Sequence, residues 1–191
     1  MLENMFDDEG RPTPEFLREL LEYNPETGRL FWRERGAHIY AEKNPAAEQV
    51  CKSWNTRFAG KAAFSTARDD GYLVGTLFAK KYRAHRIIYA LHYGEWPVFI
   101  DHINGDRSDN RIGNLRSVTL EQNSRNCKRS ALNTSGVCGV SWCKMQNTWR
   151  AYIRVNGKRK HLGRFVKIED AIAARKAANR KYNYHKNHGR D

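Results

Sequence analysis

The stretch IDHINGDRSDNRIGNLRSVTLEQN, residues 100–123, decides the fold of the central part of this chain. A short apolar strand, residues 98–100, leads into the pair Asp101-His102, and a loop rich in Asn, Asp and Gly follows. A second strand, residues 115–118, precedes a helix that we expect to begin near Thr119, where Thr-x-x-Gln forms a capping box. The pattern predicts a ββα unit.

The residue types in this unit suit the hydrolysis of a phosphodiester bond. The imidazole of His102 can take a proton from water near neutral pH. Asp101 and Asn123 offer hard oxygen donors, which favour a divalent cation that compensates charge on the leaving oxygen. The Asn residues of the loop suit a tight connection held by side-chain-to-backbone hydrogen bonds.

In residues 82–126 this pattern, with the upstream run from Ala84 to Pro97, resembles the HNH (His-Me finger, ββα-metal) homing-type endonucleases of the phage and intron branch. By position, the resemblance implies that Asp101 and Asn123 bind the metal and that His102 is the general base. It implies that Asn114 braces the loop and the backbone of His102. Because Asn123 stands where other members carry a third His, we expect Mg²⁺, or another hard divalent cation such as Mn²⁺, rather than Zn²⁺.

Two further residues close to these proposed active-site residues each allow two interpretations. Asn110 also lies in the loop and is a rival for the bracing role of Asn114. His85 either orients a phosphate or serves a packed helix, and the structural role is the favoured one.

The positive charge of the chain is concentrated in its C-terminal part. The whole chain carries a formal net charge of +13, and residues 124–191 hold seventeen Lys and Arg against three acids. The remaining residues are close to neutral. This distribution predicts a module that grips a polyanion, joined to a module with another task.

Residues 135–182 resemble the plant ethylene-response-factor (AP-two) DNA-binding domain, with landmarks at Gly139-Val140 and Leu162-Gly163. The resemblance implies three antiparallel strands packed on one helix, with the sheet facing the major groove. Contacts to DNA are then expected from Arg150, Arg154, Lys158, Arg159 and Lys160. The plant domain has arginines or a tryptophan where this chain has Cys138, Ser141, Cys143 and His161. The base preference of the plant domain therefore does not carry over.

The rest of the chain supplies shorter predictions of local structure. The apolar spacing predicts helices over 13–21, 84–93 and 168–182, and strands over 29–33, 72–78, 137–142, 148–155 and 158–165. Residues 36–53 are expected to be a loop, and 54–61 either extended strands that contact DNA or part of a small supporting fold. The four cysteines are expected to be reduced thiols; a zinc site from Cys138, Cys143 and His161 is the weaker alternative.

Together these patterns predict an α+β protein with an N-terminal mixed region (1–81), a ββα-metal nuclease unit (82–126), a linker (127–136) and an AP-two-like domain (137–191). The predicted function is metal-dependent DNA cleavage, as a nickase or a double-strand cutter. The alternative is a DNA-binding regulator with an inactive nuclease unit. Double-stranded DNA is the expected partner, with no membrane, no obligate protein partner and either a monomer or a dimer. The expected location is the cytoplasm, of a host cell if the chain is phage-encoded.

Overall fold

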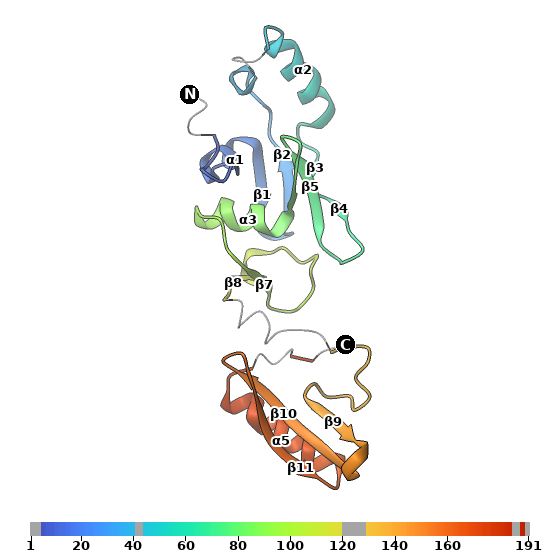
Figure 1. Cartoon of the computed structure of the whole chain (residues 1–191). Coiled ribbons are helices and arrows are strands. Elements are labelled where there is room, and N and C mark those ends of the chain that lie inside the picture. The colour runs from blue at the N-terminus through green and yellow to red at the C-terminus, as the bar shows by residue number, and fades with distance from the viewer. Residues whose placement is uncertain (1–4, 41–43, 120–128, 185–187, 190–191) are drawn as a thin grey trace. The chain divides into compact units, whose positions relative to one another are not determined.

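The computed structural model describes residues 5–40, 44–119, 129–184 and 188–189 (Figure 1). Helices and small antiparallel sheets both occur, which confirms the α+β class. The chain divides into two compact units, Met1–Ser117 and Val118–Asp191. No helix in the described ranges is both long and apolar enough to cross a membrane.

The first unit contains three antiparallel sheets, ordered β1-β2-β3, β4-β5-β6 and β7-β8. Its strands are β1 (Leu21–Asn24), β2 (Arg29–Trp32), β3 (Ala62–Ala63), β4 (Thr66–Ala67), β5 (Leu73–Leu77), β6 (Lys80–Arg83), β7 (Ile100–His102) and β8 (Leu115–Ser117). Its helices are α1 (Pro14–Leu20), α2 (Ala47–Phe58) and α3 (Ala84–Tyr93), with short 3-10 turns η2 (Ala37–Ile39) and η3 (Ile112–Asn114).

Helix α3 is the centre of the core of this unit. Ile87 and Ile88 have no exposed surface, and they belong to one apolar cluster with Leu17 and Leu20 of α1. Burying each such side chain contributes roughly 1.5–3 kcal/mol. The helix ends at Gly94, whose φ of 76° places it in the left-handed conformation that suits a C-terminal stop. The same cluster includes Ile100 and Leu115, so the core supports β7 and β8 directly.

Two local predictions in this unit are wrong. The sequence pattern predicted a loop over 36–53 and allowed extended strands over 54–61, whereas α2 occupies Ala47–Phe58. The helix buries only Ala47 and Cys51, so it has little apolar periodicity for a sequence pattern to detect. Leu21, expected on the apolar face of the first helix, begins β1 instead, although it is buried as predicted.

In its described residues, the second unit is a three-stranded antiparallel sheet, ordered β11-β10-β9, with the helix α5 against it (Figure 1). Its elements are β9 (Val140–Cys143), η4 (Lys144–Gln146), β10 (Thr148–Val155), β11 (Lys158–Phe165) and α5 (Ile168–Lys181). The turn at Asn156-Gly157 has positive φ at both residues, 51° and 75°, as a type I′ hairpin turn requires.

A buried arginine holds α5 to the sheet. Arg175 is 3% exposed, and its guanidinium donates to the backbone carbonyl of Tyr152 in β10 and to the side-chain oxygen of Asn179, the latter at 2.8 Å. Gly139 makes this approach possible, because a Cβ there would lie 2.4 Å from the Tyr152 carbonyl oxygen. The small residues Ala171 and Ala178 let the helix lie close to the strands.

Candidate active site and nucleic-acid interface

The β7-β8 hairpin places Asp101 and His102 at the end of a buried strand. Asp101 pairs with Arg116 and His102 with Leu115 across the two strands. The Asp101 and His102 side chains are deeply placed, with residue exposures of 7% and 3%. The loop between the strands folds back over this pair through the hydrogen bonds of its polar residues.

Asn114 spans that loop with both atoms of its amide. Its Oδ1 accepts from the backbone N–H of Asn104 at 2.9 Å, and its Nδ2 donates to the carbonyl of Asp109 at 2.8 Å. The backbone carbonyl of Asn114 also accepts from the N–H of Ile103, the residue after His102. A side-chain hydrogen bond from Arg111 lowers the pKa of Asp109 to about 2, so this carboxylate stays charged and bonded within the loop.

Asn110 contacts the imidazole of His102 itself. Its Oδ1 lies 3.1 Å from Nε2 of His102, and Asn110 is only 1% exposed. The hydroxyl of Tyr23 donates to the Asn110 carbonyl at 3.2 Å and accepts from the N–H of Ile112 at 2.9 Å, which fixes this part of the loop. Gly28 lies against the same backbone, where a Cβ would be 2.7 Å from the carbonyl carbon of Asn110.

This contact decides which nitrogen of His102 carries the proton. An amide oxygen can only accept a hydrogen bond, so Nε2 donates and the lone pair of the neutral ring is on Nδ1. Burial lowers the pKa of His102, while the hydrogen bond to Asn110 and the charge of Asp101 act in the opposite direction. The ring is therefore neutral at neutral pH, as a general base requires.

His85 lies beside His102 in the interior. The two ring centroids are 5.0 Å apart in an edge-on arrangement, and the ring of Tyr72 is 5.0 Å from His85 and 5.8 Å from His102. Burial, followed by the neighbouring His102, lowers the pKa of His85 to about 3. Its Nδ1 is buried without a hydrogen-bond partner among the described residues. His85 is thus a neutral ring on α3 in contact with the proposed base.

The carboxylate of Asp101 pairs with the guanidinium of Arg116, 2.7 Å from Nη2 to Oδ2. A buried carboxylate oxygen is a hard donor and fits Mg²⁺ or Mn²⁺ by its chemistry. Asn123, the second predicted ligand, lies outside the described residues. Within the described ranges, no group of three or more His, Cys, Asp or Glu side chains is placed to hold a metal ion, Cys138, Cys143 and His161 included.

Comparison with known proteins agrees with this geometry. The HNH endonuclease family matches residues 82–125. Protein 3.8 of Escherichia phage T7 is 36% identical over 83 residues, which cover 42% of this chain and 69% of that protein. The chain belongs to the HNH endonuclease family. A further relative, an uncharacterized HNH endonuclease (L560) of Acanthamoeba polyphaga mimivirus, is 32% identical over 103 residues, or 52% of this chain and 48% of the relative. No solved structure matches.

The prediction that this chain is a nuclease is confirmed by its membership of the HNH endonuclease family. The family match covers the β7-β8 hairpin, its loop and α3, which brings His85 to His102. It ends before β9, so it says nothing of the C-terminal sheet.

In the second unit of this HNH endonuclease, the strand register separates the five predicted DNA contacts onto two faces. Strand partners share a face, and Ala151 and Ile153 are buried on the side of α5. Arg154 pairs with Arg159, and both are on the opposite, open face with Arg150. Lys158 and Lys160, which pair with Val155 and Ile153, fall on the helix side.

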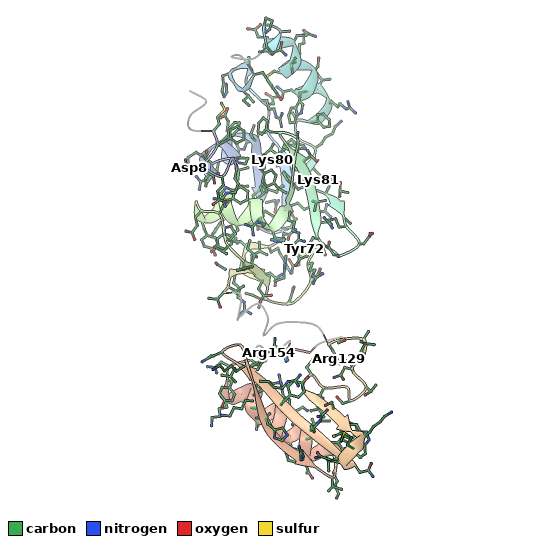
Figure 2. The ribbon with its side chains drawn as sticks, in the orientation of Figure 1. Asp8, Tyr72, Lys80, Lys81, Arg129 and Arg154 are labelled. Atoms are coloured by element: carbon green, nitrogen blue, oxygen red, sulfur yellow. The ribbon has the colours of Figure 1, made fainter. Side chains whose placement is uncertain are left out.

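Contacts of the side chains agree with this division. The ammonium of Lys160 donates to the hydroxyl of Tyr182 at the end of α5, 2.9 Å away. The guanidinium of Arg159 lies 4.1 Å from the ring centroid of Tyr152 on the open face. Figure 2 shows Arg154, which extends from the sheet of this unit.

Sequence reasoning missed Arg164, which pairs with Arg150 and joins the open face. Opposite Ala151 and Tyr152 of β10, strand β11 contains one extra residue, Leu162, which forms a β-bulge and has no strand partner. The alternation of side chains between the two faces of β11 therefore shifts by one residue at this point. The open face therefore carries Arg150, Tyr152, Arg154, Arg159, His161 and Arg164. The glycine at position 163, with φ of 145°, is the one local signal of that bulge in the sequence.

Proposed function

We propose that this chain is a divalent-metal-dependent DNA endonuclease that uses His102 as general base and grips double-stranded DNA with the open face of its C-terminal sheet. The observation that carries the proposal is the buried pair Asp101-His102, with Nε2 of His102 bonded to Asn110. A carboxylate and an oriented neutral imidazole on adjacent residues are the groups that metal-assisted hydrolysis of a phosphodiester needs.

Each residue of the site has a separate task in this proposal. His102 accepts the proton of the attacking water at Nδ1, and Asn110 holds the ring in that tautomer and orientation. Asn114 keeps the loop closed over the strand end. Asp101 and Asn123 would hold the cation, which would supply stabilisation of the negative charge on the leaving oxygen.

In this proposal the chain acts on DNA in the cytoplasm of a host cell, as a homing-type enzyme that cuts one or both strands. The viral relatives support an HNH nuclease that acts within a host cell. The basic open face supports a grip on DNA that does not depend on the cleavage site. Guanidinium groups on alternate strand positions can contact phosphates and read guanine edges. Three of the arginines on this face, Arg150, Arg154 and Arg159, are among the contacts expected with the AP-two-like resemblance, and the strand register adds Arg164.

The first test is conversion of supercoiled plasmid to nicked and linear forms, with Mg²⁺ or with chelator. His102→Ala should lower the cleavage rate by at least about 100-fold, the scale of a missing general base, and leave DNA affinity nearly unchanged. His92→Ala, an exposed histidine on α3, is the matched control and should cut like the wild type. Equal cleavage by the His102 variant would contradict the assignment. The ratio of nicked to linear product tells whether one strand or two are cut.

The second test concerns the open face. Arg154→Gln with Arg159→Gln removes two positive charges from the open face, and Lys158→Gln with Lys160→Gln removes two from the helix side. The arginine pair should weaken DNA binding and reduce the salt slope by roughly 1–2, because each phosphate contact contributes about 0.9. Equal effects of the two double variants would mean that charge, not the face, determines binding.

A further inference from the structure

Three arginines from separate elements gather around one tyrosine at the edge of the nuclease site. Tyr72 lies in the turn before β5, Arg68 follows β4, Arg83 ends β6 and Arg107 belongs to the loop between β7 and β8. Together with Asp70 in the same turn, these residues are called the Tyr72 cluster below. Figure 2 shows Tyr72 near that loop, while Lys80 and Lys81 lie elsewhere on the same unit.

The guanidinium groups of the cluster surround a single carboxylate residue. Arg68 and Arg83 each lie 3.5 Å from a carboxylate oxygen of Asp70, and Arg107 donates to the Asp70 backbone carbonyl at 2.8 Å. Two of the three also lie against the ring of Tyr72, at 4.3 Å for Arg83 and 4.8 Å for Arg107. Two guanidinium groups thus share one carboxylate, and a third is bonded to the backbone of the same residue.

Stabilisation of the fold alone does not account for this arrangement. The side chains of Arg68 and Arg83 are 55% and 43% exposed, and ion pairs with such exposure contribute between zero and about 1 kcal/mol. Their 3.5 Å separations from the carboxylate are longer than the roughly 2.8 Å of a strong charge-assisted hydrogen bond. Guanidinium groups held loosely at this spacing are able to exchange one anion for another.

The position of the cluster indicates which anion that is. The ring of Tyr72 is 5.8 Å from the ring of His102, and Arg107 belongs to the same loop as Asn110 and Asn114. The cluster therefore borders the proposed base on the side of the β4-β5 turn. A DNA strand whose scissile phosphate lies at His102 has its neighbouring phosphates within reach of these arginines.

We propose that the Tyr72 cluster binds the DNA backbone beside the cleaved bond, and that in the free protein the Asp70 carboxylate occupies the place of a phosphate. The proposal rests on the proposed function in taking DNA as the substrate. On binding, phosphate oxygens take over the guanidinium groups of Arg68 and Arg83, which match phosphate geometry. The face of the Tyr72 ring holds Arg83 and Arg107 in place.

Two opposite substitutions test the cluster in the full chain, with a short fluorescein-labelled duplex of mixed sequence and chelator present to prevent cleavage. Arg83→Gln should weaken binding by about tenfold, the loss expected for one charged hydrogen bond, and lower the salt slope by about one phosphate. Lys81→Gln, an exposed β6 residue away from Tyr72, is its matched control and should have a small effect. Asp70→Asn should tighten binding several-fold, because it removes the competing charge and keeps an acceptor for the N–H of Tyr72.

Asp69→Asn removes the same charge from the exposed neighbouring position and is the control for Asp70→Asn. A purely structural cluster predicts that Arg83→Gln and Asp70→Asn both lower the melting temperature and that neither differs from its control in affinity. That result would overturn the proposal. Opposite changes in affinity, each larger than the control, support it.

Plasmid cleavage by the wild type separates this proposal from the proposed function. If the wild type cuts with Mg²⁺ but the affinities of the variants match their controls, the cluster is not a DNA site and the nuclease assignment stands. If no plasmid is cut but the affinities change in opposite directions as expected, the DNA site stands and the proposed cleavage activity fails.

Discussion

Replacing Asn110 with leucine should lower kcat for DNA cleavage by about 5- to 13-fold and leave KM nearly unchanged. Asn110 touches no part of the substrate in the proposed mechanism; it acts on the reaction through Nε2 of His102, 3.1 Å away. Leucine is close to asparagine in shape but offers no acceptor to that nitrogen. The ring then loses the bond that fixes its tautomer and its orientation.

The magnitude follows from the charge that His102 acquires during the reaction. A hydrogen bond to a neutral group contributes about 0.5–1.5 kcal/mol, and one to a charged group about 1.5–3 kcal/mol. As Nδ1 takes the proton, the bond from Nε2 to Asn110 changes from the first kind to the second. The difference between the two, roughly 1.0–1.5 kcal/mol gained in the transition state, corresponds to that 5- to 13-fold range.

The assay is single-turnover cleavage of plasmid at several DNA concentrations, with the melting temperature measured in parallel. Asn110→Asp keeps an acceptor for Nε2 and should cut faster than the leucine variant. Removal of the unpartnered Nδ2 of Asn110 offsets part of the loss of stability, so the leucine variant should stay folded at the assay temperature. A leucine variant that cuts at the wild-type rate would refute the positioning role, and so would an increase in KM alone.

Three further predictions concern stability. Buried His85 has a pKa of about 3, against 6.5 when exposed, so between these values only the unfolded state binds this proton. The free energy of unfolding should therefore decrease as the pH is lowered through this window, by about 2 kcal/mol at pH 5. Measured by urea unfolding at each pH, this dependence of stability on pH should be weaker in His85→Gln. Arg116→Met leaves the carboxylate of Asp101 buried without its cation and should cost about 2 kcal/mol in chelator, partly regained with Mg²⁺; an equal loss with and without Mg²⁺ would argue against Asp101 as a ligand. Gly139→Ala forces a Cβ against a β10 carbonyl and should lower the melting temperature more than Gly157→Ala, whose φ is also positive but whose Cβ meets open space.

Prediction from the sequence was most accurate for elements in which local signals, such as turn residues and a glycine stop, agree with the pattern of buried residues. Helix α3 has the predicted bounds because its apolar stripe and its glycine stop agree. The β10-β11 hairpin follows from the turn at Asn156-Gly157. Helix α2 was missed because its buried residues are too few to produce a pattern, and its place depends on contacts with β2 such as that between Trp54 and Trp32.

The candidate site likewise contains residues that could be located from the sequence and contacts that could not. The Asp101-His102 pair and Asn114 could be located from their spacing in the loop. The pairing of His102 with Asn110 could not be chosen over Asn114 from sequence, because both amides lie in one loop and only its folded path decides which reaches the ring. The gathering of Arg68, Arg83 and Arg107 was also out of reach, since three distant segments supply it.

The bulge at Leu162 sets a rule for any attempt to change the DNA sequence that the open face is proposed to bind. A library randomised over the open face must take alternate positions in β10. In β11 the frame changes at the bulge, so the positions are 159 and 161 before it and 164 after it. Deleting the one extra residue, Leu162, would keep every present strand pair and restore simple alternation, but it would remove a side chain that packs against the core formed with Ala151 and Ala171. A single-codon deletion there should therefore be selected against more strongly than most substitutions in the strand.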